Sequence, residues 1–357
     1  MRTGFIGNFP ENSQTSQLRS IFAQSILKEE KIKYTHLGRT GLKVSRLALG
    51  AMNFGYLTDE KEAFNIMDAA VDNGINLFDT ADIYGTRQYP EIPKGSGISE
   101  EFIGNWIKNS GKRDKIVLAT KLYQPMDYGV NDRHLSAYHI RRACEASLKR
   151  LKIDHIDLYQ MHHIDRGTPW DEIWEAMEVL ITQGKISYVG SSNFAGWHIA
   201  TAQCKAIERH MLGLISEQDV YNLRNRAIET EVIPACRYHG LGLILWSPLD
   251  GGLLAGALDK FESGRRADLK NVVAEHHDQL VAYEVLCKEL NEKPADVALA
   301  WCLNNPVVSA PIIGPRTKAQ LEANLKAVDI SLSKETLDKL DKIWPGPEGE
   351  APEAYAW

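Results

Sequence analysis

The sequence predicts a single α/β domain of the TIM barrel class, (β/α)8, on the basis of three observations. Eight short apolar segments alternate with longer amphipathic segments from Tyr34 onward. Gly, Pro, Asn or Asp bounds each apolar segment, and nearly continuous apolar character is typical of parallel strands that are buried on both faces. Strands that alternate with helices indicate βα units, and eight such units in a row close into a barrel.

The predicted strands are short and rich in β-branched and apolar residues. They are expected at Arg46–Met52, Asn76–Ala81, Lys115–Lys121, His155–His162, Ile186–Asn193, Leu214–Tyr221, Leu241–Ser247 and Val308–Gly314. The competing architecture is a doubly wound open sheet. That fold normally has a G-x-G-x-x-G turn after its first strand, and the segment Leu49–Gly55 does not match this pattern. The barrel is therefore favoured.

The intervening segments have the periodicity of amphipathic helices. Helices are expected from Ser99 onward and at Glu60–Asn73, Ala137–Leu151, Trp170–Thr182, Gly196–His210, Asn225–His239, His277–Asn291, Pro294–Asn304, Lys318–Val328 and Lys334–Ile343. Ser99 is expected to cap its helix, with Glu100 and Glu101 in the first turn. Two irregular segments, Thr86–Gly97 and Asp250–His276, follow the second and seventh strands. Barrel loops of that kind form the active-site face, so their length points to function.

The expected domain organisation is a barrel over residues 34–344, between an N-terminal extension of residues 1–33 and a C-terminal tail of residues 345–357. The extension lacks the continuous apolar stretch of a secretory signal, and we interpret it as an appended arm without a catalytic role. The tail is rich in Pro and Gly, which prevents it from continuing the preceding helix.

Composition excludes several classes of partner. The formal net charge of -6 in 357 residues gives no reason to expect a nucleic acid. No apolar run is long enough to span a bilayer, so no membrane partner is expected. The five cysteines have no C-x-x-C spacing, which favours reduced thiols in a cytoplasmic protein over a disulfide framework. The sequence leaves open whether the protein forms a homo-oligomer.

Four polar residues lie at or just beyond the carboxyl ends of three consecutive predicted strands. Asp79 and Tyr84 follow the second strand, Lys121 ends the third and His162 ends the fourth. In a barrel these positions converge on one mouth. A tyrosine has an unperturbed pKa of about 10 and is a weak acid at neutral pH unless a cation lies near it. Lys121 supplies the cation, Asp79 holds the lysine, and His162 shares or relays the proton.

Each of these residues has an ordinary explanation when taken alone. An isolated Asp after a strand is more often a turn or cap residue, and an isolated Lys at a strand end is usually solvated. His162 and His163 would suit a core histidine or half of a metal pair. However, adjacent residues in a strand point to opposite faces, and no third ligand stands out, so no metal is expected. The combination at successive strand ends favours catalysis.

The motifs around these residues resemble those of the aldo-keto reductase superfamily, in particular its long-chain bacterial type. Phe78–Gly85 resembles the family signature around the catalytic Asp and Tyr, Leu118–Lys121 resembles its lysine strand, and Asp157–His162 resembles its histidine strand. The similarity extends from about Tyr34 to Ile343. It implies an NADPH-dependent carbonyl reductase in which Tyr84 is the general acid, tuned by Lys121, Asp79 and His162.

The resemblance also implies a site for NADPH or NADP+. Ser192 and Asn193 match the residues that hold the nicotinamide carboxamide, and Gln218 completes this grip, which fixes the ring face that points at the substrate. A helix cap is the ordinary alternative for Ser192 and Asn193. The residues expected at the cofactor are Gly50, Met52, Asp79, Ser192, Asn193, Gln218, Trp246, Ser247, Pro248, Leu249, Gly251, Leu253, Gly314, Arg316, Thr317, Gln320 and Asn324.

The choice of NADPH over NADH depends on the segment that binds the adenosine end in similar reductases. Arg316 offers a planar fork suited to a 2′-phosphate, and Thr317 adds a hydroxyl at a helix start. Gln320 and Asn324 lie one helical turn apart and are expected to face the adenine together. The ordinary alternative for Arg316 is a solvated surface charge.

The substrate is expected to be a bulky or cyclic carbonyl compound, such as a xenobiotic or toxin, a keto-sugar or a natural product. The residues expected to contact it are Phe54, Tyr84, Tyr123, His162 and Trp246, because aromatic walls suit such compounds. Tails of related enzymes help to close the pocket, so residues 345–357 are expected near the active-site mouth. Some superfamily members are cofactor-binding subunits of potassium channels, and a subunit of that kind with little turnover is the alternative function.

Overall fold

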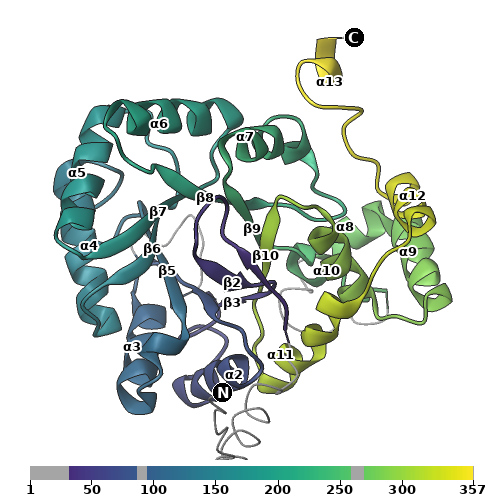
Figure 1. The fold of residues 1–357 in the computed structure, drawn as a ribbon. Helices are drawn as coiled ribbons and strands as arrows, with labels where there is room; N and C mark the ends of the chain where they lie inside the picture. Colours follow the sequence, from purple (N-terminus) through teal and green to yellow (C-terminus); the bar gives the residue numbers. More distant parts are fainter. Residues whose placement is uncertain (1–31, 87–94, 259–268, 357) are drawn as a thin grey trace, which may run out of the picture. The chain divides into compact units, whose positions relative to one another are not determined.

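The computed structural model describes residues 32–86, 95–258 and 269–356 (Figure 1). The chain separates into two units, Met1–Lys31 and Ile32–Trp357, and the fold is that of the second unit. The predicted arm of residues 1–33 therefore lies almost entirely outside the described residues, as does Trp357.

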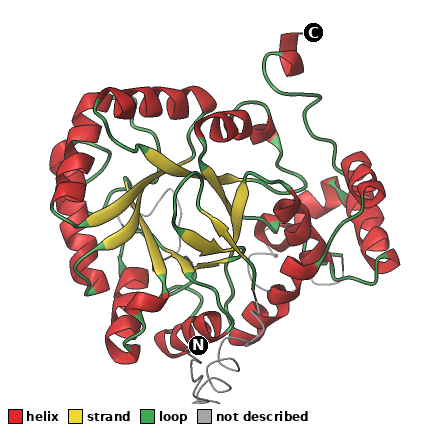
Figure 2. Cartoon of the chain, in the orientation of Figure 1, coloured by secondary structure: helices red, strands yellow, loops and turns green. Residues whose placement is uncertain are grey.

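Eight parallel strands form a closed barrel in the order β10-β3-β4-β5-β6-β7-β8-β9 (Figure 2). The strands are β3 (Ala48–Gly50), β4 (Leu77–Asp79), β5 (Val117–Leu122), β6 (Ile156–Met161), β7 (Ile186–Ser192), β8 (Leu214–Val220), β9 (Gly242–Trp246) and β10 (Val308–Ile313). The barrel closes where Ile312 and Ile313 pair with Ala48 and Leu49. This confirms the predicted (β/α)8 barrel.

Helices surround the strands in Figures 1 and 2. They are α2 (Glu60–Asp72), α3 (Ile98–Ser110), α4 (Ala137–Leu151), α5 (Trp170–Thr182), α6 (Gly196–Glu208), α7 (Val232–His239), α8 (Lys270–Glu275), α9 (His277–Glu289), α10 (Pro294–Asn304), α11 (Lys318–Asn324), α12 (Lys334–Ile343) and α13 (Glu353–Ala356). Among the described residues, no helix combines the length and apolar content needed to cross a membrane.

Several helix boundaries differ from the sequence prediction. The segment from Asn225 is not one helix but a short 3-10 turn, η2 (Ala227–Glu229), followed by α7, because Pro234 is tolerated only in the first turn of a helix. Ser99 does not cap α3, which begins after Gly97. The hydroxyl of Ser99 instead donates to the carbonyl of Ala51 at 2.9 Å, and it also forms a hydrogen bond with the Thr80 hydroxyl. Helix α8 lies within a segment that was expected to be irregular.

A small antiparallel hairpin precedes the barrel and was not predicted. Strand β1 (Tyr34–His36) pairs with β2 (Lys43–Ser45), and Arg39 between them donates its backbone N–H to the carbonyl of Gly240, which follows α7 and precedes β9. Two fully buried hairpin side chains, Leu37 and Val44, complete the apolar cluster of the barrel interior, formed with Ala48, Leu77, Val117, Ala119, Leu158, Ile215, Ile244 and Ala310. The hairpin therefore closes the amino-terminal end of the barrel.

The described part of the C-terminal tail contacts the region around α7. The backbone N–H of Ala351 donates to the carbonyl of Thr230 at 2.9 Å, and Arg237 pairs with Glu350 at 3.0 Å. These contacts join the tail to the turn before α7 and to the last turn of α7.

Candidate active site

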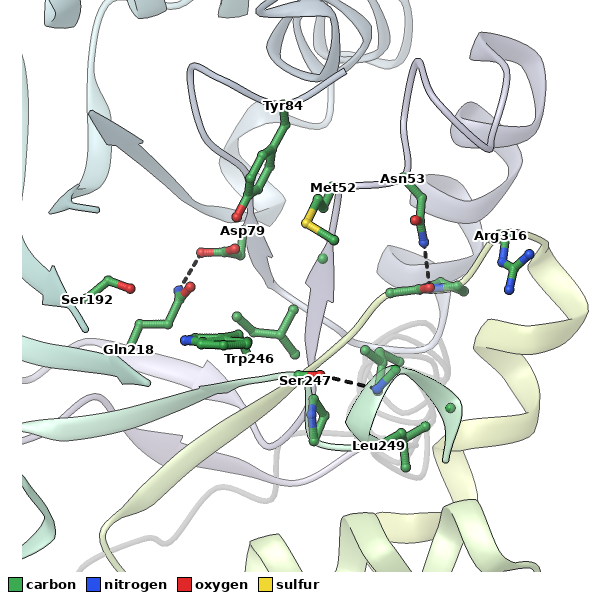
Figure 3. Close-up of a pocket in the computed structure, with 18 of the residues that line it drawn as sticks. Met52, Asn53, Asp79, Tyr84, Ser192, Gln218, Trp246, Ser247, Leu249 and Arg316 are labelled. Carbon is green, nitrogen blue, oxygen red and sulfur yellow. Dashed lines mark hydrogen bonds between the residues drawn. The ribbon is translucent and has the colours of Figure 1, made fainter. Parts of the chain in front are cut away.

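A cavity of about 690 Å³ lies at the carboxyl ends of the barrel strands (Figure 3). Most residues predicted for catalysis and cofactor binding line it: Gly50, Met52, Asp79, Tyr84, His162, Ser192, Asn193, Gln218, Trp246, Ser247, Pro248, Leu249, Gly251, Gly314, Arg316, Gln320 and Asn324. Figure 3 shows Tyr84, Asp79 and Gln218 on one side and Arg316 on the opposite side. The cavity therefore connects the residues predicted for catalysis, around Tyr84, with the residues predicted for the adenosine end of the cofactor, around Arg316.

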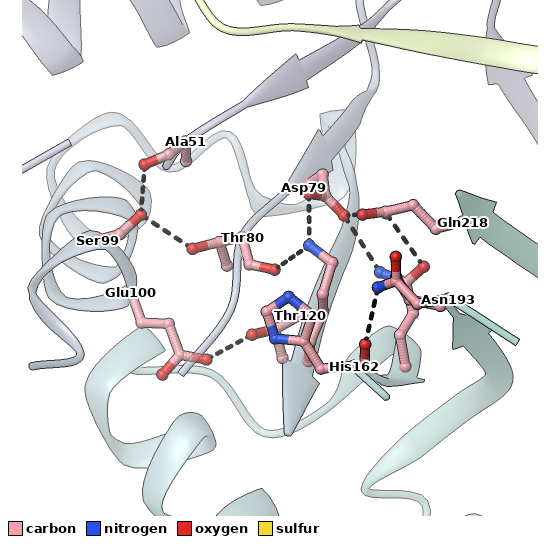
Figure 4. A network of polar contacts seen from close by, with 12 residues as sticks. Ala51, Asp79, Thr80, Ser99, Glu100, Thr120, His162, Asn193 and Gln218 are labelled. Atoms are coloured by element: carbon pink, nitrogen blue, oxygen red, sulfur yellow. Dashed lines mark hydrogen bonds and ion pairs between the residues drawn. The ribbon is translucent and has the colours of Figure 1, made fainter. Parts of the chain in front are cut away.

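A buried ion pair lies beneath this cavity. The ammonium of Lys121 is 2.6 Å from the carboxylate of Asp79 and donates to the carbonyl of Thr80 at 2.9 Å (Figure 4). The lysine side chain is 0% exposed. Burial lowers its pKa, but Asp79 and Tyr84 outweigh this effect, and the pKa lies above its ordinary value. Lys121 is therefore a permanent cation at the base of the cavity.

Tyr84 lies directly above this cation. The ammonium of Lys121 is 5.0 Å from the centre of the tyrosine ring. Burial raises the pKa of Tyr84, and the charge and hydrogen bond of Lys121 oppose that increase without reversing it. The phenol is thus protonated at neutral pH and lies beside a positive charge that stabilises the phenolate left after proton donation.

His162 also lies next to this space, and its imidazole is a neutral base. Its ring meets the Tyr84 ring edge-on, with centroids 5.8 Å apart. Burial, with smaller effects from Lys121 and His163, holds the pKa of His162 well below its ordinary value. Its Nδ1 has no hydrogen-bond partner among the described residues. A neutral imidazole in this position can hydrogen-bond an uncharged oxygen but does not supply the acidic proton at neutral pH.

Two glutamine amides hold the second oxygen of Asp79. Gln218 donates to it at 2.8 Å and Gln160 at 3.1 Å (Figure 4). Gln160 was not predicted from the sequence. The available signal was an uncharged amide in the predicted buried strand β6, where a fully buried polar group requires a partner. The two amides and Lys121 together fix the carboxylate in one orientation.

Asn193 connects the ends of four neighbouring strands. Its backbone is left-handed (φ 59°), a conformation that Asn tolerates well, and its N–H donates to the carbonyl of Gln218 at 3.0 Å. Its amide donates to the carbonyl of His162 and the hydroxyl of Ser192, and accepts from the indole of Trp246 at 3.1 Å. Helix α6 begins beyond both residues, with Ala195 at its N-cap position. Ser192 and Asn193 therefore do not act as helix caps.

At the opposite end of the cavity lies the segment after β10. Arg316 lines the cavity and forms no ion pair with any described residue, while its backbone N–H donates to the side chain of Gln320 at 2.8 Å. The hydroxyl of Thr317 caps α11 by accepting from the N–H of Gln320. Thr317 is not among the residues that line the cavity, so its hydroxyl serves the helix.

Four other predicted residues also lie outside the cavity wall. Lys121 lies beneath it, as described above. Phe54 and Leu253 are 0% exposed and belong to the hydrophobic core that surrounds the barrel. Tyr123 packs its ring against His134 and His163, with centroids 5.0 and 5.5 Å away. None of the described tail residues lines the cavity either, so the proximity of the tail to the active-site mouth stays a prediction.

Other lining residues were missed in the sequence, namely Asn53, Gln124, His163, Ala255 and Ile312. His163 is informative because strand alternation was expected to place it on the face opposite His162. Strand β6 ends at Met161, so neither histidine belongs to the strand, and their rings stack at 5.9 Å with both lining the cavity. Within the described ranges, no group of three or more His, Cys, Asp or Glu side chains is arranged to hold a metal ion.

Comparisons with known proteins match nearly the whole barrel. A model of the Aldo/keto reductase family covers residues 46–345. The chain is 57% identical over 332 residues to the uncharacterized oxidoreductase YrpG of Bacillus subtilis, covering 91% of this chain and 100% of the relative. It is 36% identical to a probable voltage-gated potassium channel subunit beta of Arabidopsis thaliana, with 91% and 100% covered. It is 31% identical to versiconal hemiacetal acetate reductase of Aspergillus parasiticus, with 87% and 96% covered.

Proposed function

The chain belongs to the aldo/keto reductase family of oxidoreductases, and from that premise we propose that it reduces an aldehyde or ketone to an alcohol, with NADPH as hydride donor and Tyr84 as proton donor. The observation that carries this proposal is the protonated Tyr84 phenol directly above the buried Lys121–Asp79 pair. A cation at that distance favours the phenolate, which is the product of proton donation.

The cavity residues fit a dinucleotide with a nicotinamide at the Tyr84 end. Ser192, Asn193 and Gln218 offer hydroxyl and amide groups suited to a carboxamide, and Arg316 offers an unpaired guanidinium for a 2′-phosphate. The volume of about 690 Å³ lies within the range of roughly 300–1,000 Å³ found for ligand pockets. When bound, NADPH supplies the hydride that the carbonyl carbon accepts.

The protein side chains perform the remaining steps of the proposed reaction. The carbonyl oxygen accepts hydrogen bonds from the Tyr84 phenol and from the neutral imidazole of His162, which polarise the carbonyl. As negative charge develops on that oxygen, the phenol transfers its proton, and the charge of Lys121 stabilises the resulting phenolate. Asp79 keeps Lys121 oriented and charged throughout the cycle.

Replacing Tyr84 with Phe tests the catalytic role. We expect Tyr84→Phe to abolish reduction across a panel of bulky and cyclic aldehydes and ketones, while the NADPH dissociation constant measured by fluorescence titration changes little. Turnover at the wild-type rate would refute the assignment. Wild-type protein that binds NADPH tightly but reduces no compound of the panel would favour the potassium-channel-subunit alternative.

Replacing Arg316 with Ala tests the choice of cofactor. A charge-assisted hydrogen bond contributes about 1.5–3 kcal/mol, so Arg316→Ala should weaken NADPH binding by roughly 10- to 150-fold and leave NADH binding nearly unchanged. Lys318→Ala is the matched control, because this neighbouring cation is exposed and does not line the cavity. Equal losses for both cofactors would remove Arg316 from the 2′-phosphate role.

We further propose that the protein works in the cytoplasm, because all five cysteines are free thiols, which suits a reducing compartment.

A further inference from the structure

Two polar side chains beside the catalytic group have no role in the reaction described above. Gln124 and His163 both line the cavity and are both half-buried. Within the described part of the chain, neither the Gln124 amide nor the His163 ring forms a hydrogen bond with another residue. Half-buried polar groups in a cavity wall are satisfied by water or by a ligand, so this pair has hydrogen-bonding capacity available for a bound molecule.

The ends of neighbouring strands bring the two residues to the same wall. Leu122 pairs with Met161 in the register of β5 and β6, and Gln124 and His163 each follow two residues beyond that pair. The backbone N–H of His162 continues the pairing by donating to the carbonyl of Leu122 at 2.9 Å. Both side chains therefore lie at the edge where the cavity passes from the catalytic group to the loops.

The ring of His163 is held in place from two sides. It stacks on the ring of His162 with an angle of 18° between the planes, and the ring of Tyr123 packs against it at 5.5 Å. Tyr123 reaches this position through a backbone φ of 143°, which is rare for a residue with a side chain. Because Tyr84 contacts His162, which in turn contacts His163, the His163 ring lies one ring beyond the site of proton donation.

The chemistry of this wall suits a neutral oxygen. Burial lowers the pKa of His163 below its ordinary value, so the imidazole is neutral at neutral pH and offers one donor and one acceptor. The Gln124 amide also offers both. Among the described residues that line the cavity, the one cation is Arg316, which lies at the far end (Figure 3). The described lining residues beside Gln124 and His163 offer no countercharge to a carboxylate or phosphate, whereas a hydroxyl matches a donor and an acceptor.

We propose that Gln124 and His163 form a subsite for a second, uncharged oxygen of the substrate, a hydroxyl in particular, next to the reacting carbonyl. The inference rests on the proposed function, since it takes the carbonyl to lie at Tyr84. It assigns the substrate to the hydroxylated aldehydes and ketones and distinguishes these from purely apolar carbonyl compounds of the same size.

Matched aldehydes that differ in one group test the subsite. The probes are meta- and para-(hydroxymethyl)benzaldehyde and the corresponding ethylbenzaldehydes, which have nearly the same shape and electronic properties at the carbonyl. Calorimetric titration of the cofactor-free protein measures binding without any redox reaction, because NADP+ would oxidise the hydroxymethyl group, and steady-state kinetics with NADPH measures turnover. We expect one hydroxymethyl isomer to bind roughly tenfold more tightly than its ethyl partner.

Variants assign that preference to the two residues. Gln124→Leu and His163→Phe should each remove most of the tenfold preference and leave binding of the ethyl compounds nearly unchanged. His163→Gln, which keeps a donor and an acceptor, should retain part of the preference. Gln183→Leu, an exposed change at the end of α5, is the control and should retain all of it. Circular dichroism and thermal melting verify that each variant is folded.

The outcomes separate the subsite from the proposed function. Wild-type protein that does not discriminate between either hydroxymethyl compound and its ethyl partner would overturn the subsite, as would an unchanged preference in both Gln124→Leu and His163→Phe. Absence of turnover with every aldehyde would instead refute the proposed reductase. In that case the binding preference and its loss in the variants would still decide whether the subsite exists.

Discussion

The buried ion pair between Lys121 and Asp79 allows structural and catalytic roles to be separated. The perturbation is a set of three variants: Lys121→Met, Asp79→Asn and the double variant. In Lys121→Met the carboxylate of Asp79 stays buried without its cation, and in Asp79→Asn the ammonium stays buried without its anion. The double variant removes both charges and keeps an acceptor for the amides of Gln160 and Gln218.

The burial of the pair determines how much each variant lowers the free energy of unfolding. Side-chain exposure is 0% for Lys121 and 5% for Asp79, and removing one partner of such a pair costs about 3–5 kcal/mol in the free energy of unfolding. The double variant leaves no buried charge unpaired, and the carbonyl of Thr80 loses its donor at a cost of about 1–3 kcal/mol. Its loss should therefore be smaller than that of either single variant and far below their sum.

Urea denaturation at pH 7 measures these losses, and NADPH oxidation with an aldehyde measures turnover. Lys112→Met is the matched control, because Lys112 contacts Asp68 at 2.7 Å but both side chains are partly exposed, and such a pair contributes at most about 1 kcal/mol. All three variants of the buried pair should lack turnover. Tyr84 has no cation beside it when Lys121 is replaced, and in Asp79→Asn the cation is no longer held in its orientation. Additive losses of stability, or turnover restored in the double variant, would refute the reasoning.

Two further predictions concern buried carboxyl groups of β8. Burial raises the pKa of Asp219 to about 6 from 3.8, so between these values the folded state holds a proton that the unfolded chain has released, and stability falls as pH rises through this range. Asp219→Asn, which keeps an acceptor for the N–H of Val220, should raise the free energy of unfolding by about 3 kcal/mol at pH 7 and leave it unchanged at pH 3, as urea denaturation at both pH values would reveal. Glu217 contacts the hydroxyl of Ser191 and accepts from the N–H of Phe194. It therefore holds the residues on both sides of Ser192 and Asn193. Glu217→Leu should weaken NADPH binding about tenfold, whereas Glu217→Gln, which keeps both contacts, should not; equal affinities in a fluorescence titration would contradict this role.

The strands of the barrel were predictable because their signal is local. Most strands that are covered on both faces are nearly continuous in apolar character, and each observed barrel strand lies within its predicted range except β5, which extends one residue further to Leu122. The β1–β2 hairpin gave no such signal. Its strands have three residues each, and the side chains of Leu37 and Val44 that close the barrel are separated by a polar turn.

Burial of individual side chains could be predicted only where strand alternation determines it. Asp79, Gln218 and Ser192 lie on strands, and the structure brings them together as expected. Phe54 and Leu253 lie in loops after strands, where an apolar side chain packs into the core as readily as it lines a cavity. The residue type was correctly read as apolar at both positions, but the direction of the side chain depends on a backbone path that the sequence does not specify.

The distinction between strand and loop positions also separates the residues proposed for the reaction from those proposed for substrate selectivity. Lys121, Asp79 and the two amides that hold Asp79 occupy strand positions, and register fixes their mutual distances to within hydrogen-bond range. Gln124 and His163 lie beyond the strand ends, and their placement depends on the left-handed backbone of Tyr123 and on ring stacking. A change in the loop that begins at Tyr123 therefore repositions the wall around the substrate while leaving the Lys121–Asp79 pair and Tyr84 in place. Selectivity can thus change while the proposed proton donor stays the same, and this explains why the four candidate catalytic residues can be recognised in the sequence whereas the substrate cannot.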